Sequence, residues 1–322
     1  MFAVVLVGGV GTRLRPLTNT TPKPLLPLGQ HTILEWLMTH LARGGVTEAV
    51  LALGFKPEPF LRAFPDATCA GVRLHYAIED SPLDTAGAIG FAARHVGLHE
   101  RSESFIVANG DIVTDLSVAT LVEQHRANVR IGAQATLHLT PVEDPSQFGV
   151  VELDAAGRVL GFVEKPAPGT ATSRYVNAGT YVFESSVLSL LPGNAPLSVE
   201  RVTFPELVRN NALYAHRTDD YWRDAGRPDT YRLANLDLIS GARRDRDVAV
   251  HSSAQVDASA VVVNSVVGAG ARVAAGARVT DSVVFPRAVI GERATVVASS
   301  VMGEVPANAV VHDALVGAQE IG

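Results

Sequence analysis

Apolar positions near the start of the chain alternate between short β-type runs and helical stripes. Residues 2–7 form a continuous aliphatic and aromatic run that ends at two glycines, which is typical of a parallel strand buried on both faces. Thr32 and Glu35 have the spacing of a capping box. The apolar stripe that begins between them and stops before Gly44 predicts a helix; its members are Ile33, Leu34, Leu37, Met38 and Leu41.

The same alternation continues to about residue 130 and predicts βαβ units around a parallel sheet. Strands are expected at 49–53, 74–78 and 104–108, and helices at 86–96 and 118–125. Strand patterns then dominate, and they predict additional, partly antiparallel strands at 133–139, 149–153, 159–163 and 176–183. The predicted fold class is α/β, with a Rossmann-like mixed, mostly parallel sheet flanked by helices. Such sheets bind ligands beyond the carboxyl ends of their strands.

The character of the sequence changes after about residue 245, where alanine, valine and glycine replace the aromatic residues. A spacing of six residues with small residues between is typical of a parallel β-helix, in which each coil buries its aliphatic residue on the next. We therefore expect an α/β domain at 1–240 and a short left-handed hexapeptide-repeat β-helix at 245–322. The repeating positions are Val261, Val267, Val273 and Val279, followed after a step of five by Val284, Ile290 and Val296.

The amino-acid composition excludes several classes of protein. The chain has 322 residues, of which 19% are charged, and a formal net charge of −6, so no basic face favours a nucleic-acid partner. Cys69 is the single cysteine, which excludes an intrachain disulfide and fits a reducing compartment. No apolar run approaches the roughly 20 residues of a membrane helix. The expectation is a soluble cytoplasmic protein without a membrane partner.

The strongest chemical signal is a glycine-rich segment directly after the first predicted strand. It reads Gly-Gly-Val-Gly-Thr-Arg-Leu-Arg-Pro-Leu-Thr over residues 8–18, and Pro-Lys-Pro follows at 22–24. Glycines let the backbone approach a triphosphate with its N–H groups turned toward the phosphate oxygens. Arg13 and Lys23 supply the positive charge that a reacting phosphorus and a departing pyrophosphate require. The spacing differs from the Gly-x-Gly-x-x-Gly of dinucleotide-binding proteins.

These motifs resemble the signature of the sugar-nucleotide pyrophosphorylases, and within that family the chain most resembles the mannose-1-phosphate guanylyltransferases. The resemblance covers almost the full length, including the hexapeptide-repeat tail. Further matches occur in the family's order at residues 79–89, 109–111, 148–151, 164–166, 177–179, 198–201 and 221–226. The implied activity is the joining of a nucleoside triphosphate to a sugar 1-phosphate with release of pyrophosphate.

The resemblance also assigns site residues. Catalysis is assigned to Arg13, Lys23 and Asp111, and a magnesium ion to Asp111 and Asp224. Asp111 follows a predicted parallel strand, where a metal ligand is expected, and magnesium is commonly held by one or two carboxylates plus substrate phosphates. The nucleotide is assigned to Leu6, Gly8, Gly9, Gly11, Thr12, Arg13, Glu79, Asp84, Gly87 and Asn109. The sugar phosphate is assigned to Gly149, Glu164, Lys165 and Asn177.

The motifs determine the identity of the base and of the sugar less closely than they determine the class of reaction. The family's Leu-Gly-Thr-Ala-Gly reads Leu-Asp-Thr-Ala-Gly here, so Asp84 replaces a glycine whose backbone approaches the base. Guanine presents two adjacent donors that a carboxylate at Glu79 or Asp84 accepts, whereas uracil and thymine present one. GTP is therefore favoured, and mannose 1-phosphate is what the resemblance implies. A glucose-1-phosphate thymidylyl- or uridylyltransferase is the alternative.

Three other classes of protein are weighed against this one. Hexapeptide β-helices often carry acyltransferases, but His251 and His312 lie at the two ends of the tail and not within its repeats. A non-catalytic regulatory homologue that binds a nucleotide sugar is disfavoured by the intact catalytic residues. A nicotinamide oxidoreductase is disfavoured because the chain lacks the glycine spacing of that class. Because every matched catalytic motif precedes residue 245, the tail is expected to serve assembly, and the chain is expected to be a homo-oligomer.

Overall fold

The computed structural model describes residues 1–9, 11–54 and 57–318. These residues divide into two compact units, one within 1–9 and 37–222 and the other within 11–36 and 223–318. We describe each unit by itself. The domain boundary expected between residues 240 and 245 stays a prediction.

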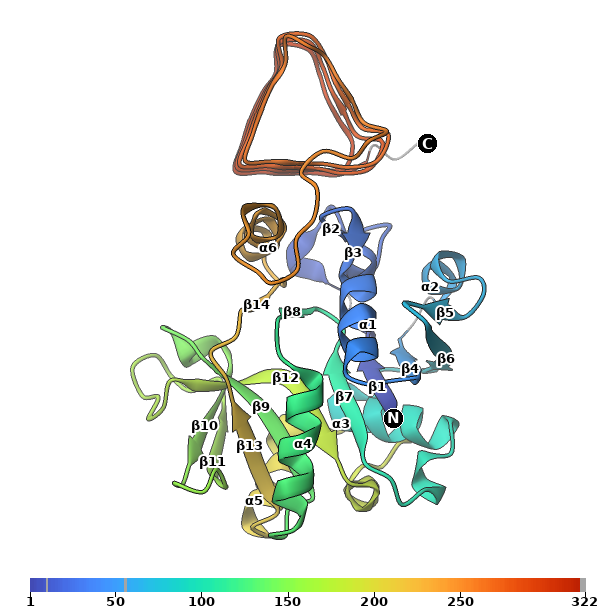
Figure 1. Cartoon of the computed structure of the whole chain (residues 1–322), viewed down its shortest axis with the longest axis vertical. Coiled ribbons are helices and arrows are strands. Elements are labelled where there is room, and N and C mark those ends of the chain that lie inside the picture. Colours follow the sequence, from blue (N-terminus) through green and yellow to red (C-terminus); the bar gives the residue numbers. More distant parts are fainter. Residues whose placement is uncertain (10, 55–56, 319–322) are drawn as a thin grey trace. The chain divides into compact units, whose positions relative to one another are not determined.

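The first unit is built on a mixed sheet (Figure 1). In the described part of the chain its strands follow the order β11-β10-β12-β7-β1-β4-β6-β5, and β9 joins β12 to β13. Their bounds are β1 Phe2–Leu6, β4 Glu48–Leu53, β5 Thr68–Cys69, β6 Val72–Ile78, β7 Phe105–Asn109, β9 Ala135–Pro141, β10 Gly149–Leu153, β11 Val159–Glu164, β12 Tyr175–Phe183 and β13 Leu213–Arg217. A short strand, β8, spans Ile112–Thr114.

Parallel and antiparallel pairings divide this sheet as the sequence predicted. Strands β7, β1, β4 and β6 are parallel neighbours. Strand β12 runs antiparallel to β7, β9 and β10, and β10 runs antiparallel to β11. The expected α/β class, with antiparallel strands added on one side of a parallel core, is confirmed.

Helices cover the sheet because its strands carry apolar side chains on both faces. Phe2 and Val4 of β1 pack in a hydrophobic cluster with α3, while Ala3 and Val5, which alternate with them, are also fully buried and so face the opposite side. The helices are α1 Ile33–Arg43, α2 Glu58–Ala63, α3 Asp84–His95, α4 Val118–Val129 and α5 Phe204–Arg209. Among the described residues, no helix is long and apolar enough to cross a membrane.

Helix α1 begins as its capping box predicts. The backbone N–H of Thr32 donates to Glu35 Oε2 at 2.6 Å, and the N–H of Glu35 donates to Thr32 Oγ1 at 3.1 Å. The helix ends at Arg43, and Gly45 has φ +88°, a left-handed conformation that glycine adopts at little cost. All five residues of the predicted apolar stripe are buried.

The second unit contains the β-helix, helix α6 (Pro228–Ser240) and the short strands β2 (Pro27–Leu28) and β3 (His31–Thr32). Figure 1 shows the coils of the β-helix as a triangle, and its three sides are parallel sheets of short strands. One sheet contains β15 Gln255–Val256, β18 Arg272–Val273, β21 Val289–Ile290 and β24 Glu304–Val305. The second contains β16 Val261–Val263, β19 Arg278–Thr280, β22 Thr295–Val297 and β25 Val310–His312. The third contains β17 Val266–Val267, β20 Val283–Val284, β23 Ser300–Val301 and β26 Leu315–Val316. The predicted left-handed β-helix is confirmed.

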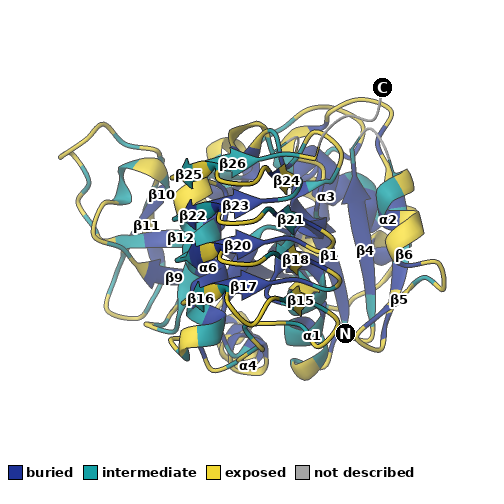
Figure 2. Cartoon of the chain, turned by 90° about the horizontal axis from the view of Figure 1, so that it is seen from above, coloured by how far each residue is buried: buried dark blue, intermediate teal, exposed yellow. Residues whose placement is uncertain are grey.

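The aliphatic ladder of the β-helix corrects one position of the predicted repeat. Val267 and the later members of the series are buried, but Val261 is 38% exposed, and its neighbour Val262 pairs with Val279 instead. The register partner of Val262 lies 17 residues further on, so one corner of this coil is a residue shorter than the six-residue repeat. Asn264 and Asp281 occupy that corner with φ of 42° and 49°, which asparagine and aspartate tolerate better than most residues. Figure 2 shows the buried strands β17, β20 and β23.

Candidate active site

In the first unit, predicted site residues gather where β1 and β7 end. Leu6 and Asn109 are register partners, and the N–H of Gly110 donates to the carbonyl of Leu6 at 2.8 Å. A Cβ on Gly110 would lie 2.8 Å from that carbonyl oxygen, so only glycine lets the chain turn this tightly. The turn brings Asp111, which is half-buried, to the carboxyl edge of the parallel strands.

The paired glycines after β1 lie close to the end of the neighbouring strand. The N–H of Val7 donates to the carbonyl of Ala52, and a Cβ on Gly8 would lie 3.2 Å from the nitrogen of Gly54. Gly8 and Gly9 are exposed. Their backbone is therefore accessible at the edge where ligands of parallel sheets bind, whereas Val10 of the same motif lies outside the described residues.

Residues assigned to the sugar phosphate come together on β10, β11 and β12. Gly149 is the register partner of Glu164, and a Cβ on Gly149 would lie 3.0 Å from Glu164 Oε2. Lys165 Nζ pairs with Glu164 Oε1 at 3.0 Å and is exposed. Glu164 thus lies over the bare backbone of β10, with an ammonium group beside it.

Asn177 joins this group to the β7 edge. Its Nδ2 donates to the hydroxyl of Tyr181 at 2.9 Å, and its Oδ1 accepts from the N–H of Gly179 at 3.0 Å. Gly179 has φ +78°, and a Cβ there would lie 2.8 Å from Asn109 Nδ2. Asn109 and Asn177 therefore flank one glycine turn. Their close packing leaves no room for a side chain at Gly179.

The hydroxyl of Tyr181 lies among several acidic side chains. Burial raises the pKa of Tyr181, and the charges of Glu200, Glu164 and Asp111 raise it further, whereas the hydrogen bond with Asn177 opposes them. Three carboxylates from separate segments therefore act on one buried hydroxyl.

Glu200 is a residue to which the sequence assigned no role. Its Oε2 accepts from Thr85 Oγ1 at 2.7 Å and from Ser198 Oγ at 2.8 Å. The N–H of Val199 donates in turn to Thr85 Oγ1. The available signal was the Ser-Val-Glu-Arg match at 198–201, which the network now connects to the start of α3.

The two candidate base-reading carboxylates differ in environment. Glu79 is buried; burial raises its pKa, and the backbone N–H of Leu83 that donates to Glu79 Oε2 opposes the rise. Asp84 is exposed with φ +55°, so it keeps the left-handed backbone for which the family's glycine is suited. Gly87 is buried where a Cβ would strike the carbonyl of Ala195, so packing alone accounts for this glycine.

In the second unit, the two predicted catalytic cations and Asp224 lie around Gly226. Lys23 Nζ lies 3.5 Å from Asp224 Oδ1. A Cβ built on Gly226 would lie 3.1 Å from Lys23 Nζ, 3.2 Å from Arg13 Nη2 and 2.7 Å from Asp224 Oδ1. Lys23 is buried and Arg13 exposed. The bare backbone of Gly226 therefore leaves the space in which both cations and a carboxylate meet.

Gly11 and Thr12 begin the segment that presents Arg13. Gly11 has φ +63° and precedes the short 3₁₀ turn Thr12–Leu14, and Thr18 Oγ1 donates to the carbonyl of Gly11 at 2.8 Å. A Cβ on Gly11 would lie 3.3 Å from Lys23 Cβ. The glycine thus brings the arginine turn and the lysine turn together.

The arginines that flank Asp224 in the sequence have other carboxylate partners. Arg223 Nη2 pairs with Asp237 Oδ2 at 2.9 Å, and Arg227 Nε pairs with Asp229 Oδ1 at 3.2 Å. Asp224 is instead near a lysine distant in sequence. Among the described residues, no group of three or more histidine, cysteine or acidic side chains has the arrangement of a metal site.

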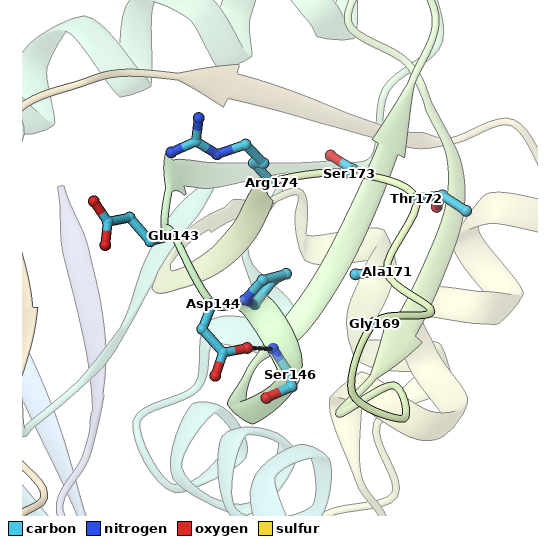
Figure 3. Close-up of a pocket in the computed structure, with 9 residues that line it drawn as sticks. Glu143, Asp144, Ser146, Gly169, Ala171, Thr172, Ser173 and Arg174 are labelled. Atoms are coloured by element: carbon cyan, nitrogen blue, oxygen red, sulfur yellow. Dashed lines mark hydrogen bonds between the residues drawn. The ribbon is translucent and has the colours of Figure 1, made fainter.

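A surface pocket of about 370 Å³ lies beside the sugar-phosphate residues in sequence but contains none of them. It is lined by the segments 143–146 and 169–174, and Asp144 accepts there from the N–H of Ser146 (Figure 3). These segments precede Gly149 and follow Lys165. The residues that line the pocket are thus close in sequence to the predicted sugar-phosphate residues.

A mostly parallel α/β sheet with exposed glycines directly after its first strand is typical of proteins that bind phosphorylated nucleotides beyond the strand ends. The model of the nucleotidyl transferase family matches residues 2–241, so the chain belongs to this family. It is 36% identical over 263 residues to the mannose-1-phosphate guanylyltransferase of Mycobacterium tuberculosis, covering 80% of this chain and 71% of that protein. It is 33% identical to the probable mannose-1-phosphate guanylyltransferase 1 of Oryza sativa, covering 81% and 74%.

Solved structures show the same fold. HddC from Yersinia pseudotuberculosis is 27% identical, with a TM-score of 0.61 over 73% of this chain and 97% of that one. A putative glucose-1-phosphate thymidylyltransferase from Bacillus anthracis is 24% identical, with a TM-score of 0.65 over 77% and 98%. The chain is a sugar-phosphate nucleotidyltransferase by family and by fold.

Proposed function

We propose that the protein joins GTP to mannose 1-phosphate, forming GDP-mannose and releasing pyrophosphate. The observation that carries the nucleotidyl transfer is the convergence of Arg13, Lys23 and Asp224 at Gly226. Paired cations of this kind are suited to the charge that develops on a departing pyrophosphate. The names of the two guanylyltransferase relatives support the substrates, and HddC has been solved in complex with GMP-PN.

The proposed reaction is in-line attack by a phosphate oxygen of the sugar 1-phosphate on the α-phosphorus of the triphosphate. The oxygen–phosphorus bond forms as the bond to the pyrophosphate oxygen breaks, and no covalent enzyme intermediate is needed because the attacking phosphate is already anionic. The protein therefore has to position two polyanions and offset their charge. Each charged contact is worth about 10²- to 10³-fold in rate.

The residues divide between the two substrates in this proposal. Leu6, Gly8, Gly9, Gly11, Thr12 and Asn109 surround the nucleotide, with Gly87 beside its base. Glu79 or Asp84 accepts from guanine. Gly149, Glu164, Lys165 and Asn177 bind the sugar phosphate, with Glu164 accepting sugar hydroxyls and Lys165 contacting the phosphate. These roles follow the family motifs.

Magnesium is the proposed cofactor, with Asp111 and Asp224 as its ligands. Two carboxylates completed by substrate phosphates are a donor set that magnesium accepts. Both side chains lie at edges that ligands reach, since Asp111 is half-buried and the side chain of Asp224 is 28% exposed. A bound ion would offset phosphate charge, and Lys23 and Arg13 hold the rest of the anion.

The experiment that tests the function is a matrix of GTP, UTP, dTTP and ATP against mannose, glucose, heptose and N-acetylglucosamine 1-phosphates, scored by pyrophosphate release. We expect the highest kcat/KM for GTP with mannose 1-phosphate. A maximum with dTTP or UTP and glucose 1-phosphate would replace the proposed substrates, and absence of release from every pair would remove the activity.

The chain is also proposed to assemble as a homo-oligomer. Valines on the outer side of the β16–β25 sheet are exposed, with Val263 51% and Val310 76% accessible, and closed assemblies of identical chains are the usual partners of such faces. Light scattering tests this, since a mass of 34.0 kDa would identify a monomer.

A further inference from the structure

The segment that carries Arg13 and Lys23 belongs to the same compact unit as the β-helix. Helix α6 contacts both parts of this unit. It packs on strand β17 of the β-helix, and Arg232 Nη1 donates to the carbonyl of Asp281 at 3.1 Å. The tail is therefore part of the body that contains the catalytic cations.

A first line of contact runs from the β-helix to Pro27 through two aromatic rings. Phe285 is buried, and its ring centroid lies 6.1 Å from that of Tyr231. Tyr231 is fully buried, and its hydroxyl donates to the carbonyl of Pro27. Pro27 follows the short turn Lys23–Leu25, in which the backbone carbonyl of Lys23 accepts from the N–H of Leu26 at 3.0 Å.

A second contact lies at the other end of the segment. A Cβ on Gly317, in the last coil, would lie 2.8 Å from Cβ and 2.9 Å from Cγ of Pro16. Pro16 is separated by one residue from the turn Thr12–Leu14, which presents Arg13. The last coil of the β-helix therefore supports the arginine turn with no space for an added methyl group.

Hydrogen bonds restrain the residues after Lys23 as well. The N–H of Gly29 donates to Asn235 Oδ1 at 2.8 Å, and the N–H of Gln30 donates to Asp247 Oδ2 at 2.7 Å. Gln30 Nε2 also donates to the carbonyls of Val248 at 3.0 Å and Val267 at 3.3 Å. Contacts with α6 and the β-helix thus occur before and after the lysine turn.

We propose that the β-helix positions Arg13 and Lys23 against Asp224, and that Gly317 and Phe285, acting through Pro16 and Tyr231, are positioning residues for pyrophosphate release. The inference rests on the proposed function. A displacement of about 1 Å at a charged catalytic group costs up to about 10²-fold in rate. The order of the motifs alone favours a tail that catalysis does not need, but these contacts favour a tail that catalysis requires for its full rate.

The first test compares Gly317→Ala with Gly291→Ala in the full-length protein. A Cβ on Gly291 would lie 2.5 Å from the nitrogen of Ala307, so this control crowds the β-helix internally without touching the motif segment. We expect Gly317→Ala to lower kcat about tenfold and to leave the KM for sugar 1-phosphate unchanged. Equal kcat in the two variants at equal melting temperature would overturn the proposal.

A second pair of variants removes one hydroxyl and keeps the ring. Tyr231→Phe removes the donor to Pro27, and the matched control Tyr214→Phe removes the hydroxyl that donates to the carbonyl of Ile131 at 3.4 Å in the other unit. We expect kcat to fall several-fold only in Tyr231→Phe. In a Lys23→Ala background, Tyr231→Phe should have little further effect, because coupled residues are non-additive; an undiminished effect would contradict the proposal.

Calorimetric titration with inorganic pyrophosphate separates this inference from the proposed function. We expect about a tenfold weaker affinity in Gly317→Ala than in Gly291→Ala, because displaced cations hold the anion less well. A wild-type protein that binds pyrophosphate but transfers no nucleotide would remove the proposed function while this comparison still tests the positioning. Equal pyrophosphate affinities would overturn the positioning.

Discussion

At the scale of single residues, glycines decide where charged groups meet. Gly226 leaves the space in which Arg13, Lys23 and Asp224 converge, and Gly149 leaves the backbone over which Glu164 lies. Both positions are ones where an added methyl group would approach a charged atom within about 3 Å. The lack of a side chain at these two glycines therefore leaves the room that the charged side chains occupy.

Gly226→Ala should lower kcat by at least about tenfold, because the new methyl group pushes Lys23, Arg13 or Asp224 from its position. The control is Gly161→Ala, where a Cβ makes only an ordinary contact of 3.4 Å with Glu152. Pyrophosphate release measures both variants. Near-normal kcat in a folded Gly226→Ala protein would argue against convergence of the cations during the reaction.

Lys165→Ala should raise the KM for the sugar 1-phosphate far more than the KM for the nucleotide. The ammonium group is exposed and is paired only at the surface with Glu164, and loss of a ground-state contact is seen mainly in substrate affinity. Steady-state kinetics with each substrate varied in turn provide the measurement. A parallel rise in both constants would contradict the assignment of Lys165 to the sugar phosphate.

At the scale of elements, a ladder of buried serines supports the short corner of the β-helix. Ser265 Oγ accepts from the N–H of Ser282 at 3.0 Å, and Ser282 Oγ accepts from the N–H of Ser299 at 3.0 Å. Each hydroxyl also donates to the carbonyl two residues earlier. One side chain thus satisfies a buried N–H of the next coil and donates its own hydroxyl proton as well.

Ser282→Ala should lower the free energy of unfolding by about 1–3 kcal/mol, because it leaves the buried N–H of Ser299 without its acceptor. The control is Ser259→Ala, since Ser259 Oγ accepts from the N–H of Gly276 at 3.0 Å at an exposed corner, where water replaces it. Denaturant unfolding compares the two. Similar losses in both variants would show that burial does not set the cost.

Buried histidines make the stability of the first unit depend on pH. Burial, together with the charges of His216 and His40, lowers the pKa of His138 on β9 to about 3. His216 on β13 is its register partner, and burial lowers the pKa of His216 as well, whereas Asp220 opposes that shift. His138 Nε2 lies 2.9 Å from Thr218 Oγ1.

The unfolded chain binds a proton at His138 near the ordinary pKa of about 6.5, whereas the folded chain resists it down to about 3. Between these values the unfolded state carries more protons, so the free energy of unfolding should fall as the pH is lowered below about 6.5. The free energy of unfolding of His138→Asn should depend less steeply on pH than that of the wild type. The control His99→Asn changes an exposed site and should keep the wild-type slope. Urea unfolding from pH 5 to 8 measures the slopes, and identical slopes would refute the contribution of His138.

At the scale of the whole molecule, the two proposed magnesium ligands come from different units. Asp111 belongs to the unit with the sheet, and Asp224 belongs to the unit with Arg13, Lys23 and the β-helix. The proposal that one magnesium ion is held by both comes from the sequence motifs. It predicts a coupling between two residues far apart in the chain.

Asp111→Asn and Asp224→Asn should each reduce kcat strongly, and the double variant should be scarcely worse than the poorer single variant, because residues that act as a unit are non-additive. Raised magnesium should partly restore the single variants. Binding of Mn²⁺ in the presence of nucleotide, followed by electron paramagnetic resonance, should also weaken in each variant. Losses that multiply independently would contradict a shared ion.

The sequence predicted most of the elements because their signals are local. The capping box at Thr32 and Glu35 starts α1, and the continuous apolar run at 2–7 forms a strand buried on both faces. The six-residue repeat predicted the β-helix, but it assigned Val261 to the buried ladder in place of Val262. That error arose because valine occupies both position 261 and position 262. The step of five that is visible between Val279 and Val284 therefore could not be located in the preceding coil, where it separates Val262 from Val267.

What the sequence determined by itself was the family, the order of the elements and the residue types of the site, since motif spacing and periodicity depend on neighbours along the chain. Only the tertiary structure decided which charges meet. Lys23 lies beside Asp224, while Arg223 pairs with Asp237 and Arg227 with Asp229. It also placed the β-helix in contact with Pro16. Such contacts join segments distant in sequence, and close packing, which no local pattern encodes, determines them.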